Sequence, residues 1–117
     1  MSKLTNKKCV PCEGGLPAMD IPEENTNMKE IPEWALNREE IHKITREFKF
    51  KNFKKSMKFV NKVADIAEEE GHHPDIYIYY DTVKLELYTH AVNGLFINDF
   101  IIAAKVDEIY EEFQNEK

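Results

Sequence analysis

The stretch ITREFKF, residues 44–50, decides how the fold is predicted from this chain. Its side chains alternate, so that Ile44, Phe48 and the other even positions form one face and polar residues at odd positions form the other. A period of two is typical of a β-strand with one buried and one solvated face. Just upstream, residues 34–36 are apolar and precede the turn-prone Asn37, which favours a brief strand pairing back onto residues 44–50.

The residues between Asn52 and Gly71 predict a helix directly after this strand. Asn52 is a good capping residue, and the apolar residues behind it recur at spacings of three and four, which places them on one helix face. Gly71 suits the left-handed conformation that ends a helix, and Pro74 prevents the helix from resuming. The apolar stripe consists of Phe53, Met57, Val60, Ala64 and Ala67, widened by Phe59, Val63 and Ile66.

Residues 76–88 predict a second pair of strands. Isoleucine and tyrosine alternate over 76–80, and apolar residues alternate with polar or aromatic ones over 83–88. Asp81-Thr82 supplies a plausible turn between them, so we expect a hairpin with its charged residues on the outer face.

The two ends of the chain differ in character. Asn98 and Asp99 are expected to begin a last helix, whose residues 100–113 are apolar around much of the helix circumference. Residues 1–33 hold four of the five prolines and two of the four glycines, so we expect a loosely packed lead-in. Within it, Asp20 caps a short helix that reaches about residue 30.

The predicted order is α-β-β-α-β-β-α. Strands with one polar face, joined by connections of these lengths, predict an α+β fold: a single four-stranded antiparallel sheet with helices packed on one face. A chain of 117 residues suits one domain overall. We divide it into the lead-in, residues 1–33, and the α+β domain, residues 34–117.

Composition narrows the classes of function. Sixteen Lys and Arg against twenty-two Asp and Glu give a net charge of −6, which argues against a nucleic-acid or anionic-membrane surface but still permits a local basic patch. No apolar run is long enough to span a bilayer and the first residues carry no hydrophobic segment, so we expect a soluble, cytoplasmic protein. Two cysteines are too few for a disulfide-framed secreted fold.

Several catalytic motifs do not fit this sequence. Gly14-Gly15 lacks the spacing of a phosphate-binding loop, and Ser2 and Ser56 lie beside neither a histidine nor a nucleophile-elbow sequence. Cys9 and Cys12 have the spacing of redox and zinc sites, but no second pair completes four ligands. Two free thiols is the simpler interpretation.

Histidines carry the most informative pattern. His72, His73 and His90 lie within nineteen residues, in a loop leaving a helix and at the end of the hairpin. Neighbouring imidazoles can hold one acid and one base near neutral pH. Pro74 biases the preceding residue toward an extended conformation. Metal-free acid/base chemistry, a three-histidine zinc site and surface histidines without a role all remain open, whereas His42 is expected to be structural or merely exposed.

Three glutamates, residues 68–70, end the second predicted helix. They could supply a carboxylate base, yet carboxylates are mildly unfavourable at a helix C-terminus. We expect Glu69 and Glu70 to face water.

The segment EEEGHHP at 68–74, followed by Tyr80, Thr89-His90, Gly94-Leu95 and Asp99, closely resembles the signature of the pterin-4a-carbinolamine dehydratase family. The likeness extends through Trp34 and residues 46–50 to cover about 30–112, and residues 12–15 look like the lead-in of bacterial members. Ile76 stands where some animal members have Trp, and Val92 replaces a cysteine of some of them.

The resemblance implies a hydro-lyase that converts 4a-hydroxytetrahydropterin to quinonoid dihydropterin and water during tetrahydrobiopterin recycling. It implies no metal or organic cofactor, a functional link to an aromatic amino-acid hydroxylase, and a homodimer or homotetramer. Two alternatives stay open: a non-catalytic protein-binding module, because animal members also pair with a homeodomain transcription factor, and a pterin role linked to molybdenum cofactor metabolism.

The resemblance also implies roles for individual residues. His72 and His90 would do the acid/base work and His73 would position the substrate, so these three are the expected catalytic residues. Glu68 and Asp99 would orient the imidazoles. The expected pterin-binding residues are His72, His73, Pro74, Thr89, His90, Ala91 and Val92.

Overall fold

Strand β2 (Lys43–Lys49) lies inside a four-stranded sheet, between β1 (Ala35–Asn37) and β4 (Thr82–Leu87). Strand β3 (Asp75–Tyr79) forms the far edge, giving the order β1-β2-β4-β3 with every pair antiparallel. This computed structural model describes residues 3–9 and 17–115.

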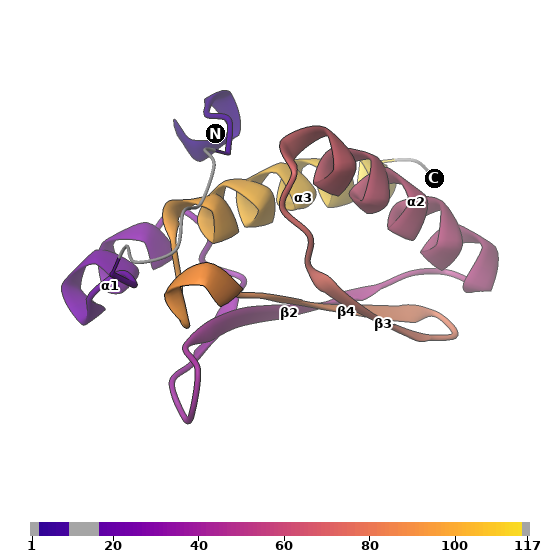
Figure 1. Cartoon of the computed structure of the whole chain (residues 1–117). Helices are drawn as coiled ribbons and strands as arrows, with labels where there is room; N and C mark the ends of the chain where they lie inside the picture. The colour runs from indigo at the N-terminus through magenta and orange to yellow at the C-terminus, as the bar shows by residue number, and fades with distance from the viewer. Residues whose placement is uncertain (1–2, 10–16, 116–117) are drawn as a thin grey trace.

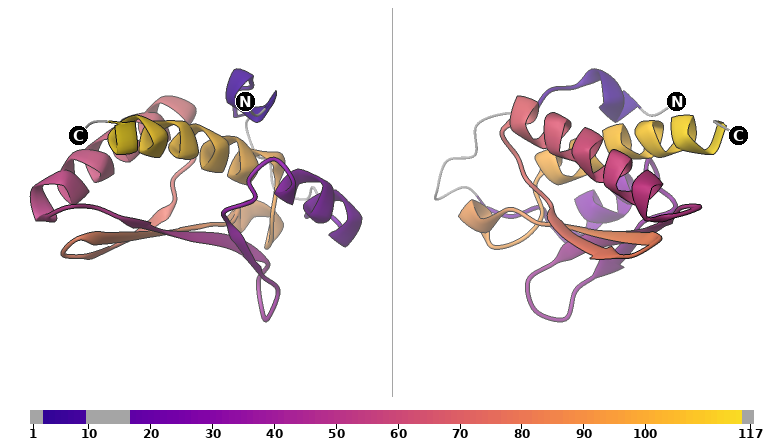
Figure 2. Two further views of the ribbon diagram at one scale, coloured as in Figure 1. Left: turned by 180° about the vertical axis from the view of Figure 1, so that it is seen from behind. Right: turned by 90° about the vertical axis from the view of Figure 1, so that its right-hand side faces the viewer.

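The helices cover one face of this sheet (Figure 1). Helices α2 (Phe53–Glu70) and α3 (Ile97–Asn115) lie side by side above it, as the rotated views in Figure 2 also show. Helix α1 (Ile21–Met28) lies at one end, near the β1–β2 hairpin. Two short 3₁₀ helices, η1 (Lys3–Asn6) and η2 (His90–Val92), complete the fold. The predicted α+β class and the single antiparallel sheet are confirmed.

The register explains how the sheet buries one face. Phe48 lies opposite Val83, and Ile44 lies opposite Leu87, so the apolar positions of both strands point at the helices. All four side chains are fully buried. The alternation of apolar and polar residues that predicted these strands therefore corresponds to the alternation of side chains that face the helices and side chains that face away from them.

Arg46 is the charged exception on this inner face. Its Nη1 is 2.7 Å from Oδ1 of Asp107 on α3, and the same carboxylate accepts a hydrogen bond of 2.8 Å from the Trp34 indole. Burial raises the pKa of Asp107, while these two donors act in the opposite direction. The pairing lets a guanidinium lie over the Phe48 and Tyr110 rings without leaving a charge unmatched.

Local signals set the ends of the helices as expected. Oδ1 of Asn52 accepts a 2.9 Å hydrogen bond from the Lys55 amide, and Gly71 ends α2 with a φ of 69°. Oδ1 of Asp20 accepts one of 2.9 Å from the Glu23 amide at the start of α1. These caps satisfy amides that a helix leaves unpaired at its ends.

Several boundaries differ from the prediction: β1 and β2 are each shifted by one residue, and larger differences occur at the hairpin, α1 and α3. The hairpin turns at Tyr80 and Asp81, because Tyr79 pairs with Thr82 and Tyr80 adopts a φ of 55°, the positive value that a two-residue hairpin turn requires. Helix α1 ends at Met28, short of residue 30. Helix α3 begins at Ile97, ahead of the predicted capping residues.

The described part of the lead-in contributes side chains to the core. Leu4 and Ile31 are buried within the same apolar cluster as the sheet and helices. The division of the chain at residue 33 stays a prediction. Among the described residues, no helix combines the length and apolar composition needed to cross a membrane.

Candidate active site

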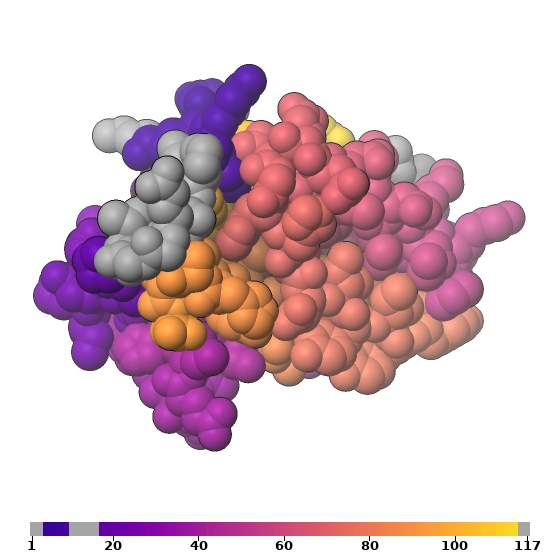
Figure 3. All heavy atoms as spheres, viewed as in Figure 1, coloured from indigo at the N-terminus to yellow at the C-terminus, as the bar shows by residue number. Residues whose placement is uncertain are grey.

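Three segments meet at one end of the sheet: the loop after α2, the turn η2 after β4, and the first turn of α3. The loop after α2 is held by the His72 amide, which donates to the Ala67 carbonyl at 3.2 Å. Thr89 and Gly94 exchange backbone hydrogen bonds of 2.8 and 3.4 Å, and Asn93 closes the loop between them with a φ of 54°. In Figure 3, η2 and the loop after α2 are exposed on the same face of the molecule.

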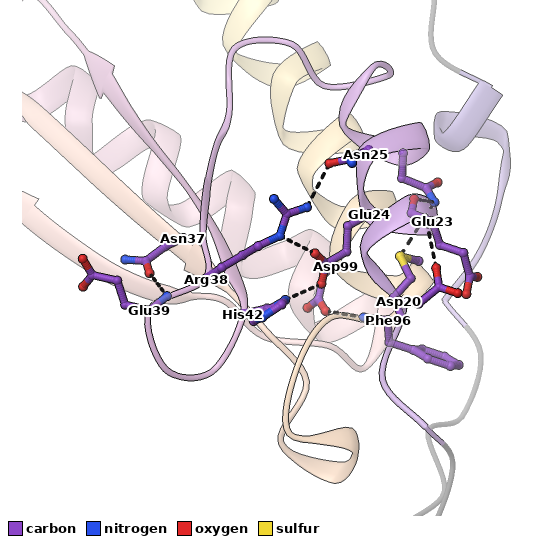
Figure 4. Close-up of polar contacts among 12 residues, drawn as sticks. Asp20, Glu23, Glu24, Asn25, Asn37, Arg38, Glu39, His42, Phe96 and Asp99 are labelled. Atoms are coloured by element: carbon purple, nitrogen blue, oxygen red, sulfur yellow. Dashed lines mark hydrogen bonds and ion pairs between the residues drawn. The ribbon is translucent and has the colours of Figure 1, made fainter.

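Asp99 is the centre of the polar network at this end. Its Oδ1 lies 2.6 Å from Nε2 of His72, and its Oδ2 accepts from the Thr89 hydroxyl at 2.9 Å. The same Oδ2 accepts from the Phe96 amide at 3.0 Å, the contact drawn in Figure 4. The Asp99 side chain is fully buried, and that of His72 is 12% exposed. One carboxylate therefore joins the ends of α2 and β4 to the start of α3.

This contact fixes which ring nitrogen of His72 is free for chemistry. An ionised carboxylate only accepts hydrogen bonds, so Nε2 carries the hydrogen that points at Asp99. Nδ1 is then the nitrogen that can take or give a proton. A carboxylate behind an imidazole holds the ring in one tautomer and stabilises the imidazolium when it forms.

His73 points to a different partner. Its Nε2 lies 2.5 Å from Oε2 of Glu68, and both side chains are largely exposed. Exposed ion pairs of this kind add little rigidity. Glu68 thus contacts His73, while Asp99 contacts His72, so the two carboxylates expected to orient imidazoles reach different rings.

His90 pairs with a residue that the sequence analysis did not identify. The Tyr88 hydroxyl lies 2.8 Å from Nε2 of His90, and the two rings are 4.6 Å apart. Residues 88 and 90 lie on either side of Thr89, whose backbone is extended, and this places their side chains on the same side. That spacing was the signal available in the sequence for this contact.

The other expected binding residues surround these groups. Pro74, Thr89 and Val92 are buried, and Ala91 is exposed beside His90 on η2. His72, Thr89 and Asp99 form one hydrogen-bonded unit, and His90 follows Thr89 directly in the chain. The three imidazoles each bond a different partner.

Glu70 contradicts the expectation that it faces water. Its side chain is 5% exposed, and its Oε2 accepts a 2.8 Å hydrogen bond from Nζ of Lys105 on α3. Its Oε1 accepts one of 2.7 Å from the Cys9 amide. The Lys105 ammonium, followed by the Cys9 amide, lowers the pKa of Glu70. A carboxylate at an unfavourable helix end is thus matched by a cation from the neighbouring helix.

Cys9 lies on the other side of this contact. Its thiol is half-buried and approaches the Asn98 carbonyl at 3.8 Å. Burial, followed by the Glu70 carboxylate, raises the pKa of the Cys9 thiol to about 12. The thiol stays protonated at neutral pH and is a poor nucleophile. Cys12 lies outside the described residues, so a Cys9–Cys12 site stays untested.

The described geometry gives no support to the zinc interpretation. Within residues 3–9 and 17–115, no three or more His, Cys, Asp or Glu side chains come together in a way that could hold a metal ion.

His42 has a structural contact away from this end of the sheet. Its Nδ1 lies 2.7 Å from Oε2 of Glu24, whose other oxygen accepts from Nε of Arg38 at 2.9 Å (Figure 4). The Glu24 side chain is almost fully buried, and its two partners come from the loop that joins β1 to β2. The cluster joins α1 to that loop, which agrees with the structural interpretation of His42.

Comparison with known proteins identifies the family. The family model described as Pterin 4 alpha carbinolamine dehydratase matches residues 17–109. This chain belongs to that family. A protein of Halorhodospira halophila named "Putative pterin-4-alpha-carbinolamine dehydratase" is 45% identical over 106 residues, covering 91% of this chain and 96% of the relative. One of the same name from Chlorobium luteolum is 42% identical over 113 residues, covering 96% and 99%.

A solved structure shares the fold. The crystal structure of a "transcriptional coactivator/pterin dehydratase" from Brucella melitensis superposes with a TM-score of 0.75 at 31% identity, covering 80% of this chain and 98% of the other. The recognition of the family from its histidine and aspartate spacing is therefore confirmed.

Proposed function

We propose that this member of the family dehydrates 4a-hydroxytetrahydropterin to quinonoid dihydropterin. The observation that carries the proposal is the buried Asp99 carboxylate, which holds His72 by one oxygen and Thr89 by the other. Such an arrangement suits an imidazole that must exchange a proton in a fixed orientation. Family membership and the names of the relatives support a pterin dehydratase at the coarser level.

The reaction needs two proton transfers. One proton goes to the hydroxyl on C4a, so that the C–O bond breaks and water leaves with its electron pair. The other proton leaves the neighbouring ring nitrogen, whose electrons form the new double bond to C4a. Imidazoles suit both steps near neutral pH.

We assign the two transfers to His72 and His90. The Nδ1 atom of His72 is the exchanging nitrogen, because Nε2 is held by Asp99. His90 is the first residue of η2 and directly follows Thr89, and its Nε2 contacts the Tyr88 hydroxyl. The exposed His73 is assigned to positioning the substrate, with Glu68 behind it. Pro74, Ala91 and Val92 complete the proposed pterin-binding surface.

The biological setting is part of the same proposal. The substrate would come from an aromatic amino-acid hydroxylase, and the product would be reduced to the tetrahydropterin, both in the cytoplasm. The chain would work without a metal or organic cofactor, as a homodimer or homotetramer.

A protein-binding role is the second candidate, and one observation favours it. The Brucella melitensis protein that shares this fold is named as a transcriptional coactivator as well as a pterin dehydratase. Such a role would not require the His72–Asp99 contact, which separates the two candidates.

The deciding experiment measures dehydration of enzymatically generated carbinolamine, followed by the absorbance of the quinonoid product. We expect turnover well above the spontaneous rate, unchanged after prolonged chelation. Turnover equal to the spontaneous rate would refute the proposal and favour the binding role or another pterin, including one of molybdenum cofactor metabolism. Loss on chelation with recovery on adding zinc would refute its metal-free part.

A further inference from the structure

The basic residues of this acidic chain are concentrated in one segment. Residues 49–62 contain six lysines and no acidic residue. Since the whole chain carries a net charge of −6, the other residues together carry −6 − 6 = −12. Six like charges in one segment repel each other, and an anion beside them would relieve this repulsion. The lysines are Lys49, Lys51, Lys54, Lys55, Lys58 and Lys62.

A cavity of about 240 Å³ lies within this basic region. It is formed where β2 ends, α2 begins and α3 ends, which is the end of the molecule away from η2 (Figure 1). The described residues that line it include three lysines and three aromatic residues but no carboxylate. They are Lys49, Phe50, Lys51, Lys55, Tyr110, Phe113 and Gln114.

Two other cavities of the molecule have the opposite character. One, of about 270 Å³, is lined by four glutamates and Lys105. The other, of about 410 Å³, is lined by three carboxylates and Arg46. The cavity lined by Lys49, Lys51 and Lys55 therefore differs from both in the sign of its charge, because lysines are the only charged side chains among the described residues that line it.

The cavity wall is aromatic and held in place. The Phe50 ring lies edge-on to Tyr110 and to Phe113, with ring centroids 5.5 and 5.8 Å apart. The Tyr110 hydroxyl donates to the Lys49 carbonyl at 3.0 Å, which ties α3 to the end of β2. A further flat ring can extend this edge-to-face arrangement, which is the geometry that aromatic pairs favour.

We propose that this cavity binds a small aromatic anion, with one ring and a carboxylate or phosphate group. The ring would pack against Phe50 and Phe113, and the anionic group would face Lys51 and Lys55. The volume is just below the 300–1,000 Å³ or so of drug-sized ligand sites, which limits the occupant to a compact molecule. The site is remote from the histidine segments, so this proposal does not depend on the proposed function.

The test is a titration of the folded chain followed by amide chemical shifts. The probes are benzoate, phenyl phosphate, benzyl alcohol and benzylamine, which share one ring and differ in charge. We expect saturable shifts at Phe50, Lys51 and Phe113 with both anions, at least ten-fold weaker binding of the alcohol, and no binding of the amine. Added salt should weaken binding of the anions.

Matched lysine variants test which positive charges bind the anion. The double variant Lys51→Gln, Lys55→Gln should weaken benzoate binding at least ten-fold, while Lys29→Gln, at the exposed end of α1, should leave it unchanged. Equal binding of alcohol and benzoate, shifts centred elsewhere, or an unaffected double variant would each overturn the proposal. Binding of a glutamate decapeptide without binding of either aromatic anion would also overturn it, in favour of an acidic protein partner.

Discussion

At the scale of single residues, the proposed chemistry depends on one buried contact and one exposed one. Asp99 holds His72 from inside the molecule, whereas His90 is exposed and held by Tyr88. If each imidazole transfers a proton, His72→Ala and His90→Ala should each lower kcat by about 10²-fold or more, because general acid/base groups contribute roughly 10² to 10⁴. The double variant should lose less than the product of the two single losses, since the residues act as a unit.

His73→Ala supplies the matched comparison. A positioning contact exists in both the ground and the transition state, so KM should rise more than kcat falls. Steady-state kinetics of the four variants with generated carbinolamine, together with their circular dichroism, check these expectations. A folded double variant that works at the parent rate would refute the catalytic assignment.

Tyr88 offers a finer prediction at the same scale. A phenol hydroxyl can donate or accept a hydrogen bond, and the tautomer of His90 decides which. We predict the arrangement in which Tyr88 donates to Nε2 of His90 and the ring hydrogen is on Nδ1. Tyr88→Phe removes this donor but keeps the ring. A hydrogen bond worth about 1 kcal/mol predicts a fall in kcat of about five-fold.

Two measurements separate positioning from a general structural effect of this substitution. Imidazole ¹⁵N shifts should show one neutral tautomer of His90 in the parent and a mixture in Tyr88→Phe. Tyr77→Phe, which removes a hydroxyl bonded to Glu86 on the sheet, is the control and should change neither kcat nor the tautomer signature. An unaltered His90 signature in Tyr88→Phe would rule out the positioning role.

At the scale of elements, contacts between distant elements were harder to predict than the elements themselves. Alternation in residues 44–50, the Asn52 cap and the glycine after Glu70 depend on neighbours in sequence, and the structure has each of them. The Glu70–Lys105 pair joins residues 35 positions apart, and no local pattern indicates that they meet. Tyr88 was missed although its spacing to His90 is local, because a tyrosine in a strand usually needs no polar partner to explain it.

The Glu70–Lys105 pair also predicts how stability depends on pH. The pKa of Glu70 is lowered in the folded chain, so this pair stabilises the fold above the ordinary pKa of a glutamate and is lost as pH falls through the lowered value. Glu70→Gln should lower the free energy of unfolding by roughly 1–3 kcal/mol at pH 7.

The loss should shrink as pH falls through the lowered pKa of Glu70, because the parent then also loses the charge. Denaturant unfolding at a series of pH values from 7 into acid measures it, with the exposed Glu69→Gln as control. A destabilisation that stays constant over the whole series would contradict this account.

At the scale of the whole molecule, the sheet edge is the surface that a second copy would cover. An apolar last helix suggests an oligomer from sequence, but the structure buries Ile101, Ile102 and Val106 of α3 within the single chain. The edge strand β3 is different, because Tyr77, Ile78 and Tyr79 are all at least 40% exposed. Residues 76–80 also contain no charge or proline, the features by which natural edge strands avoid pairing.

We therefore expect a homodimer or homotetramer in which β3 pairs with β3 of another copy, since an antiparallel pair of identical edges has two-fold symmetry. Ile78→Lys places a charge in this edge and should shift the chain to monomers, whereas Asn37→Lys, in the short opposite edge strand β1, should not. Sedimentation velocity at micromolar concentration measures the outcome. A parent chain found only at 13.8 kDa would exclude an oligomer. An oligomer unaffected by Ile78→Lys would show that the interface does not involve β3.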